Sequence, residues 1–307
     1  MRQARVTKRG QRLTGNGDFT IFLDDAQSGH GAATPDRPSG DASAIELVFA
    51  GGGGERKLSL AALVEASDVT ITMLPDTPDV ERVVLGTDGV LERGRPGMLH
   101  LDTSTIAPAA SRAMAERLAA RGIRFVDAGV GRSPAHAERG ECLFMVGAEA
   151  ADLARIRPLL EAMGDRIIHA GPPGTGIALK IVNNYIAMCL CQVNAEAFTL
   201  AARLGLPART VFEVVTNSLS SNDHLKLYWP TKVLRGDIEP GFALDLAFKD
   251  LSIGVAAAEA VGAPAHVGAA AREAMDRARR IHGLGARDIT AVLTAAAAEA
   301  GIEPPVL

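Results

Sequence analysis

The sequence predicts an α/β fold in which a mostly parallel sheet is followed by an all-α domain. From about Ala66 to residue 170, short apolar strands alternate with helical patterns, and this alternation is typical of a parallel sheet. Beyond Pro173, only helical periodicity recurs. With 307 residues, 47% of them hydrophobic and 22% charged, the chain is long enough for two folded domains.

The first half of the pattern resolves into four strands. Residues 69–73 form a buried strand that ends in a turn at Pro75, and a short helix follows. Residues 98–102 form the next strand, and a Ser/Thr loop leads to a helix that begins at Pro108 and stops near Gly122. The segments IRFVDAGV and ECLFMVG supply a third and a fourth strand, and ADLARIRPLLEAMG supplies a helix.

The second half is predicted to be helical throughout. A helix that contains Lys180 runs to about Leu204, and apolar-periodic segments follow at 207–219, 225–235, 242–261, 264–281 and 287–300. We therefore place the domain boundary near 171, which gives a sheet domain over 56–170 and a helical domain over 171–307. Residues 1–55 form an atypical N-terminal segment, rich in Gly, Asp, Arg and Ser and compatible with disorder, in which only DFTIFLDD and AIELVFA resemble strands.

Composition excludes several classes of partner. The net charge of −4 gives no reason to expect a nucleic acid or an acidic membrane surface. We expect no run long and apolar enough to span a bilayer, and the basic start is not followed by the apolar segment of a secretory signal. Cys142, Cys189 and Cys191 lack the spacing of a disulfide framework or a zinc site, so we expect no metal and a cytoplasmic protein.

One apolar helix carries polar side chains that suggest chemistry. Lys180, Asn183 and Asn184 stand three and four positions apart and share one helical face. A lysine is rarely buried alone, and near a helix N-terminus the macrodipole lowers its pKa, which suits a proton donor. The alternative is a lysine at the domain rim whose ammonium reaches solvent.

Further candidates follow the predicted strands, because ligands of α/β domains bind beyond the carboxyl ends of strands. The hydroxyls of Thr103, Ser104 and Thr105 can bind a ribose or carboxamide, or else cap the next helix. Arg132, beside Ser133 in a Gly-rich loop, offers a planar fork of donors for an anion, or else is a solvated loop residue. Lys249 lies in an apolar segment, where an ion pair with Asp250 is the alternative.

Five motifs together resemble the β-hydroxyacid dehydrogenases, the family of 3-hydroxyisobutyrate dehydrogenase and tartronate semialdehyde reductase. They are SDVTITMLP, LDTSTIAP, the Gly loop after VDAGV, GPPGTGIALKIVNN and GFALDLAFKDL, between about Ala66 and Asp288. The loop Val130-Gly131-Arg132-Ser133, where most of the family has a V-S-G-G pattern, is most similar to the 3-sulfolactaldehyde reductase branch.

This resemblance implies a Rossmann-like NAD-binding domain and an all-α dehydrogenase domain, with NADP as an alternative cofactor. It implies that Lys180 donates the proton, and that Arg132, Ser133, Asn183 and Asn184 bind the anionic end of a small aldehyde or hydroxyacid. Leu74, Pro75, Thr105 and Lys249 then line the nicotinamide. A homodimer or homotetramer is implied as well. Reduction of 3-sulfolactaldehyde to 2,3-dihydroxypropane-1-sulfonate is the expected reaction, and 3-hydroxyisobutyrate-type or tartronate semialdehyde-type chemistry is the alternative.

The sequence departs from the family at its start. A strand, G-x-G-x-x-G and a helix normally present backbone amides to the pyrophosphate, and this sequence has no such element. The Gly run at 51–54 is a substitute candidate. We therefore expect reduced cofactor affinity, and a non-catalytic remnant that kept only a helical scaffold is a third interpretation.

Overall fold

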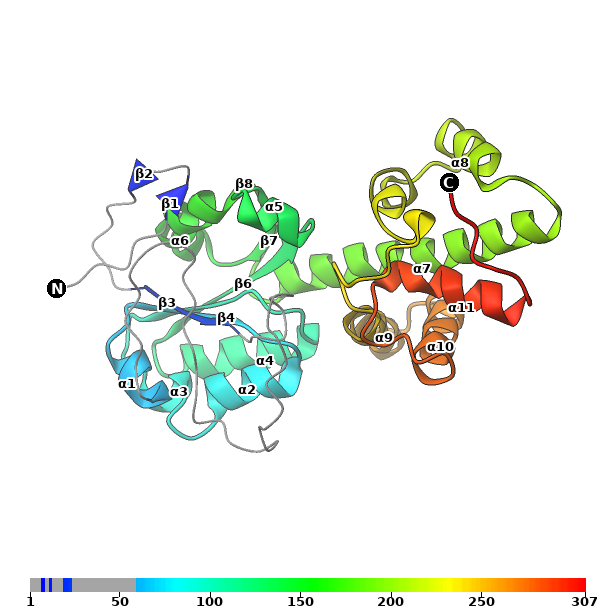
Figure 1. The fold of residues 1–307 in the computed structure, drawn as a ribbon. Helices are drawn as coiled ribbons and strands as arrows, with labels where there is room; N and C mark the ends of the chain where they lie inside the picture. The colour runs from blue at the N-terminus through cyan, green and yellow to red at the C-terminus, as the bar shows by residue number, and fades with distance from the viewer. Residues whose placement is uncertain (1–6, 9–10, 13–18, 24–58) are drawn as a thin grey trace. The chain divides into compact units, whose positions relative to one another are not determined.

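The computed structural model describes residues 7–8, 11–12, 19–23 and 59–307. Contacts divide the chain into an N-terminal unit, Met1–Lys180, and a C-terminal unit, Ile181–Leu307 (Figure 1). The predicted strand AIELVFA and the Gly run at 51–54 lie outside the described residues. The predicted strand within DFTIFLDD is present as β3, Phe19–Leu23.

The N-terminal unit is built on a sheet of six described strands in the order β3-β4-β5-β6-β7-β8. Strands β3 to β6 are parallel, β7 is antiparallel to β6, and β8 is parallel to β7. The predicted parallel-dominated α/β fold is confirmed. Beside β3, the strands are β4 (Val69–Met73), β5 (Leu99–Asp102), β6 (Arg124–Gly131), β7 (Cys142–Gly147) and β8 (Gly164–Gly171), and β1 (Thr7–Lys8) pairs separately with β2 (Gln11–Arg12).

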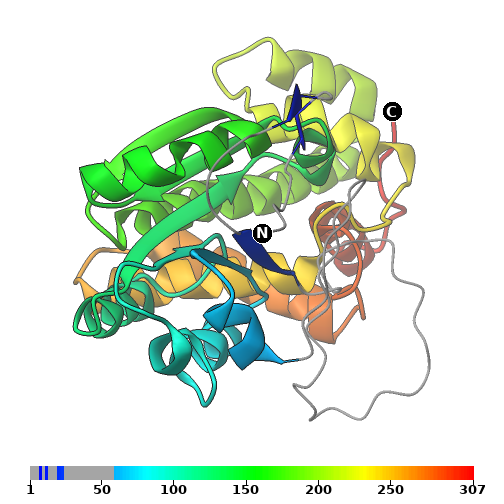
Figure 2. The ribbon, with the colours of Figure 1, turned by 90° about the vertical axis from the view of Figure 1, so that its left-hand side faces the viewer.

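Helices cover the two faces of this sheet (Figures 1 and 2). Because side chains alternate along a strand, Val69 and Ile71 of β4 pack in a core with residues of α6, whereas Thr70 and Thr72 face the other way. On the second face, apolar residues of α2, α3 and α4 form another core. The helices are α1 (Leu60–Glu65), α2 (Thr77–Leu85), α3 (Val90–Arg93), α4 (Pro108–Ala119), α5 (Pro134–Glu138) and α6 (Ala150–Met163).

Beyond β8, the described chain is helical, as predicted. The C-terminal core gathers around Trp229, which is fully buried against Phe198, and includes Met275 and Leu251. The elements are α7 (Thr175–Arg203), α8 (Ala208–Thr216), η1 (His224–Tyr228), η2 (Trp229–Thr231), η3 (Val233–Arg235), α9 (Leu244–Ala260), α10 (His266–Arg280), η4 (Ile289–Ala291) and α11 (Val292–Glu299).

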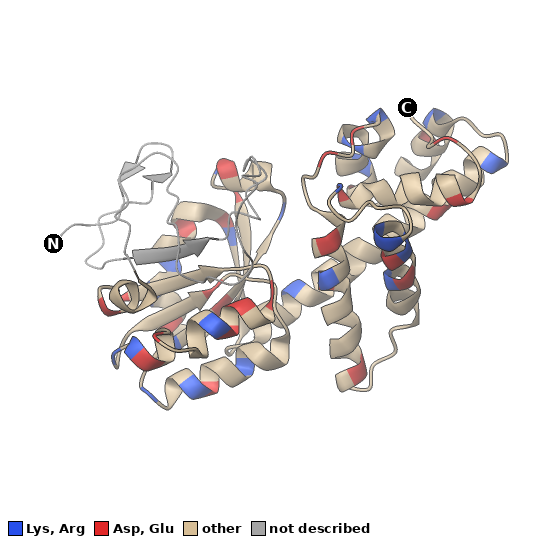
Figure 3. Cartoon of the chain, turned by 60° about the horizontal axis from the view of Figure 1, so that its bottom comes forward, with Lys and Arg blue, Asp and Glu red and all other residues tan. Residues whose placement is uncertain are grey.

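Helix α7 is the longest described element, with 29 residues. By length and composition alone it can cross a membrane, so the expectation that no run is long and apolar enough was wrong for this segment. Of its most apolar window, 44% is buried within the protein, and a single helix of this kind is weak evidence for a membrane span. Acidic and basic side chains are interspersed over the helices of both units (Figure 3), in keeping with the small net charge.

Candidate active site

The predicted site residues of the N-terminal unit follow the carboxyl ends of three neighbouring parallel strands. Leu74 and Pro75 follow β4, Thr105 follows β5, and Arg132 and Ser133 follow β6. Parallel strands bring these ends to one edge of the sheet, where α/β proteins bind ligands. Leu74, Pro75 and Thr105 are all partly exposed there, so two apolar side chains and a hydroxyl face this edge.

The loops after β4 and β5 are tied together by the two other hydroxyls of the predicted Ser/Thr cluster. The Leu74 N–H donates to Ser104 Oγ at 2.9 Å, and Thr103 Oγ1 donates to the Thr72 carbonyl oxygen at 2.8 Å. Both side chains are buried, and the residue before α4 is Ala107, which makes no side-chain cap. Ser104 and Thr103 therefore neither cap α4 nor face the edge, and Thr105 is the partly exposed member of the cluster.

A buried polar network supports these loops from within the sheet. Thr72 Oγ1 donates to Asp102 Oδ1 at 2.7 Å, and His100 lies between Thr70 and Thr72, with its ring nitrogens 2.9 and 3.1 Å from their hydroxyls. Burial raises the pKa of Asp102 to about 6 and lowers the pKa of His100 to about 3. Asp102 Oδ1 also accepts the Ser104 N–H at 3.2 Å, so this carboxyl holds the loop after β5.

Asp127 of β6 fixes the start of α7. Its carboxylate accepts the backbone N–H of Gly174 and, at 2.6 Å, that of Ile177, groups that have no partner within the helix. A carboxylate at this end also interacts favourably with the helix dipole. Burial outweighs these hydrogen bonds and raises the pKa of Asp127 to about 6. The side chain is therefore structural.

Lys180 packs directly on the backbone of β6. A Cβ atom added to Gly129 would lie 2.5 Å from Lys180 Cβ and 3.0 Å from Lys180 Cγ, so the strand must have glycine at this position. The lysine is partly buried, near the carboxyl end of β6. Two features of the sequence, the glycine in β6 and Asp127 two residues earlier, thus fix where the Lys180 side chain begins.

Asn183 and Asn184 continue the same helical face, one turn after Lys180. Asn184 is buried and its amide donates to Asp250 Oδ2 at 2.6 Å, while the exposed Asn183 donates to Asn184 Oδ1 at 3.2 Å. Lys249 forms an ion pair with Asp250 at 3.0 Å, so the ion-pair alternative for this lysine is present in the structure. Asp250 joins the two asparagines to Lys249, a connection that sequence spacing did not indicate.

Arg132 adopts a backbone conformation that is rare for a residue with a side chain. Its φ is 74°, in the left-handed region that favours glycine. Nη1 donates to the Glu141 carbonyl oxygen at 2.6 Å and to Asp165 Oδ1 at 2.7 Å. Ser133 Oγ lies 2.8 Å from His136 Nδ1. The Arg132 side chain is therefore fixed by two hydrogen bonds and is not a freely solvated loop residue.

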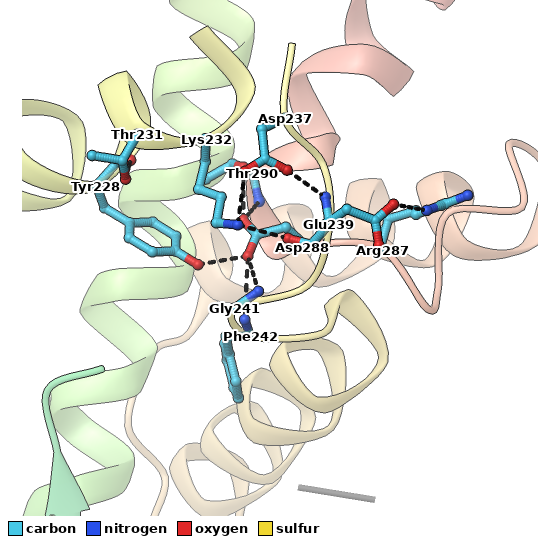
Figure 4. Close-up of polar contacts among 10 residues, drawn as sticks. All are labelled: Tyr228, Thr231, Lys232, Asp237, Glu239, Gly241, Phe242, Arg287, Asp288 and Thr290. Carbon is cyan, nitrogen blue, oxygen red and sulfur yellow. Dashed lines mark hydrogen bonds and ion pairs between the residues drawn. The ribbon is translucent and has the colours of Figure 1, made fainter. Parts of the chain in front are cut away.

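The buried carboxylate of Asp288 organises the loop before α9, the helix that carries Lys249 (Figure 4). Asp288 Oδ2 accepts the Tyr228 hydroxyl and the N–H groups of Gly241 and Phe242, at 2.9 and 3.2 Å. Asp288 Oδ1 accepts the N–H and the hydroxyl of Thr290. Burial raises the pKa of Tyr228 far above its usual value, so the phenol remains a donor. Among the described residues, no group of acidic, histidine or cysteine side chains is placed to hold a metal ion.

Comparisons with known proteins identify relatives of this chain. Residues 38–171 match the NAD binding domain of 6-phosphogluconate dehydrogenase, and residues 174–296 match the NAD-binding domain of NADP-dependent 3-hydroxyisobutyrate dehydrogenase. The 3-sulfolactaldehyde reductase of Escherichia coli is 37% identical over 79% of this chain and 81% of its own. The chain belongs to the β-hydroxyacid dehydrogenase family.

Other relatives carry different activities. The 3-hydroxyisobutyrate dehydrogenase of Pseudomonas aeruginosa is 40% identical over 68% of this chain and 72% of its own. The NAD-dependent L-serine dehydrogenase of the same organism is 38% identical over 75% of this chain and 78% of its own. The structure of 3-hydroxyisobutyrate dehydrogenase from Mycobacterium tuberculosis with L-serine superimposes with a TM-score of 0.71 at 33% identity, over 77% of this chain and 82% of that one.

These comparisons establish the reaction class. The protein is an NAD(P)-dependent oxidoreductase of the 3-hydroxyacid dehydrogenase type, which acts on CH–OH groups of small substrates. Its relatives share this chemistry across several substrates, so the family does not fix the substrate.

Proposed function

We propose that this protein reduces a small anionic aldehyde with NADH, and that the aldehyde is 3-sulfolactaldehyde. The product is then 2,3-dihydroxypropane-1-sulfonate. The observation that carries the proposal is Arg132, which follows β6, is fixed by two hydrogen bonds and stands at the edge of the sheet where α/β proteins bind ligands. An arginine fork makes two parallel hydrogen bonds to a sulfonate, which lysine cannot reproduce.

Lys180 acts as the proton donor in this proposal. When bound, the dihydronicotinamide would supply a hydride to the aldehyde carbon. As the C–H bond forms, negative charge develops on the carbonyl oxygen, and the Lys180 ammonium stabilises that charge and transfers its proton to the oxygen. The contact with Gly129 supports this role, because it fixes the first two side-chain carbons of Lys180 before the substrate arrives.

Arg132, Ser133, Asn183 and Asn184 bind the substrate end that does not react. The anion at Arg132 orients the aldehyde, so that remote binding energy is used to position the reacting carbon. Asn184 is fixed by Asp250, and Asn183 is fixed in turn by Asn184, so both amides are oriented in advance. Such prior orientation lowers the entropy that binding costs.

The nicotinamide end of the cofactor is proposed to lie against Leu74, Pro75, Thr105 and Lys249. The first three suit this role, because they present apolar surface and a hydroxyl at the carboxyl edge of the sheet. The hydrogen bond between Leu74 N–H and Ser104 joins the two loops that carry them. NAD is the preferred cofactor in this proposal, and NADP is the alternative.

The proposal also covers the oligomeric state and the cellular location of the protein. Several apolar residues on one face of α7 are exposed, at spacings of four and seven: Val182, Ile186, Val193, Leu200 and Leu204. Such a stripe is typical of an interaction surface, which supports a homodimer or homotetramer. We also propose a cytoplasmic location, as expected from the sequence.

A substrate panel tests this function. NADH oxidation is measured with 3-sulfolactaldehyde, with 3-hydroxyisobutyrate-type and tartronate semialdehydes, and with the uncharged glyceraldehyde. Arg132→Ala should lower kcat/KM for sulfolactaldehyde by about 30-fold or more and change the glyceraldehyde value little, because a desolvated charge pair is lost. An equal loss on charged and uncharged aldehydes would remove Arg132 from the substrate site. Preference for a carboxylate aldehyde would support the 3-hydroxyisobutyrate-type or tartronate semialdehyde-type alternative.

A further inference from the structure

Within the part of the chain that the structure describes, the guanidinium of Arg132 is held through one of its nitrogens. Both of its hydrogen bonds to described residues use Nη1, which donates to the Glu141 carbonyl oxygen and to Asp165. A guanidinium has five N–H donors, so three, on Nε and Nη2, make no hydrogen bond to the described residues. Those two nitrogens form the edge that binds an anion through two parallel hydrogen bonds.

A β-bulge brings Asp165 to this arginine. In the pairing of β7 with β8, Cys142 lies opposite Gly164 but Leu143 lies opposite Arg166, so Asp165 is the extra residue. Bulges re-aim a side chain and are common beside active sites. The resulting ion pair has Nη1 and Oδ1 2.7 Å apart, and the Asp165 side chain is 44% exposed.

We propose that Asp165 determines specificity by restricting the anion site at Arg132 to singly charged head groups. The inference rests on the proposed role of Arg132 in substrate binding. Asp165 offsets part of the positive potential at the free edge of the guanidinium. The neighbouring Arg139 adds little, because its Nε donates to the Glu141 carboxylate at 2.9 Å.

The charge dependence follows from electrostatics. The attraction between the site and a head group grows in proportion to the charge of the head group, whereas its desolvation cost grows roughly with the square of that charge. A weakened positive site therefore retains a sulfonate or a carboxylate and rejects a phosphate, which carries nearly two charges at neutral pH. The pair thus selects against phosphorylated aldehydes of the same size.

The test measures binding, so it does not depend on turnover. Calorimetry gives Kd for 2,3-dihydroxypropane-1-sulfonate and for glycerol 3-phosphate at about pH 8, where the phosphate is a dianion. Asp165→Asn keeps the size and the Oδ1 acceptor but removes the charge. We expect the sulfonate to bind about threefold more tightly and the phosphate about tenfold more tightly. The second factor should be about the square of the first, because the dianion interacts twice as strongly with the removed charge.

Asp68→Asn is the matched control. Asp68 is 45% exposed and pairs with Arg95 at the amino end of β4, so this variant changes the net charge equally at the opposite edge of the sheet. It should leave both Kd values unchanged. If Arg132→Ala weakens both ligands while Asp165→Asn changes neither, the anion site stands and the role of Asp165 is overturned. If neither ligand binds the wild-type chain, or Arg132→Ala has no effect, the proposed substrate site fails and this inference with it.

Discussion

At the scale of the residue, Lys180 is the side chain on which the proposed chemistry depends. Lys180→Ala should lower kcat by about 10²-fold or more, the usual effect of removing a positioned acid. Lys180→Arg keeps the charge but cannot give up its proton at neutral pH, so it should be nearly as slow. Steady-state NADH-oxidation assays measure kcat of the two variants, and circular dichroism is the control for folding. Near-normal kcat in a folded Lys180→Ala variant would assign proton donation to another group.

Single residues were predictable where an unusual side chain broke a regular pattern. Lys180 and Asn184 are conspicuous in the sequence because they interrupt an apolar helix, and Arg132 because it stands in a Gly-rich loop. His100 and Asp102 were missed because their partners, Thr70 and Thr72, come from another strand about 30 residues away. Strand register decides such pairs, and periodicity within one segment carries no information about register.

At the scale of the element, the packing of α7 against β6 depends on one glycine. Gly129→Ala places a methyl group 2.5 Å from Lys180 Cβ, so the helix must shift. We expect a loss of about 1–3 kcal/mol in unfolding free energy, typical of overpacking, together with a loss of kcat. Urea denaturation and steady-state kinetics measure the two effects.

Gly131→Ala on the same strand is the control for that substitution. Its added Cβ meets the flexible side chain of Leu143 at 3.1 Å, and this side chain can move aside. Its effect on kcat should therefore be small. Equal effects of the two substitutions on kcat would show that backbone conformation, rather than contact with Lys180, explains the result.

The network between β4 and β5 should make stability depend on pH. The folded-state pKa of Asp102 is about 6, above its ordinary value of 3.8, because burial disfavours the charged form. Its contribution to stability is thus complete below about pH 4 and is lost as pH rises through 6. The shift corresponds to about 3 kcal/mol at most.

Asp102→Asn isolates this contribution, because the amide keeps an acceptor oxygen for Thr72 and does not titrate. Between pH 4 and 7, the unfolding free energy of the wild type should fall relative to that of the variant. Urea denaturation at several pH values measures the difference. If the unfolding free energies of the wild type and the variant change with pH in the same way, Asp102 is not the group that titrates. Another buried carboxyl, such as Asp127, whose pKa is also raised to about 6, would then explain the pH dependence.

Elements with strong periodicity were predicted well from sequence. β4 has the predicted bounds, and the helices after Gly171 occur within the predicted segments. β8 was not predicted, because it is mostly exposed or half-buried, has only Ile167 and Ile168 as large apolar residues, and lies between a helix and a Gly-Pro turn. The segment 225–235 contains one π turn and two 3-10 turns rather than one α-helix, and Pro230 removes a backbone donor there.

At the scale of the whole molecule, the affinity for NADH tests the effect of the missing G-x-G-x-x-G element, in which the chain differs from its family. No G-x-G-x-x-G element presents amides to the pyrophosphate, so the chain should bind NADH weakly. Replacing residues 1–55 by the strand, Gly-rich turn and helix of a relative should tighten binding. Calorimetric titration with NADH measures both proteins. Tight binding by the unchanged chain would mean that residues 1–55 supply a phosphate site of another kind.

The left-handed backbone at Arg132 has a consequence for how this position tolerates mutation. A φ of 74° costs a residue with a side chain about 1–2 kcal/mol, a cost that glycine does not carry and asparagine carries least among the rest. In a library of all amino acids at position 132, glycine and asparagine should therefore melt at the highest temperatures while losing affinity for the anion. Arginine should rank first in catalysis and well below them in thermal tolerance, so stability and activity are traded against each other at this one residue.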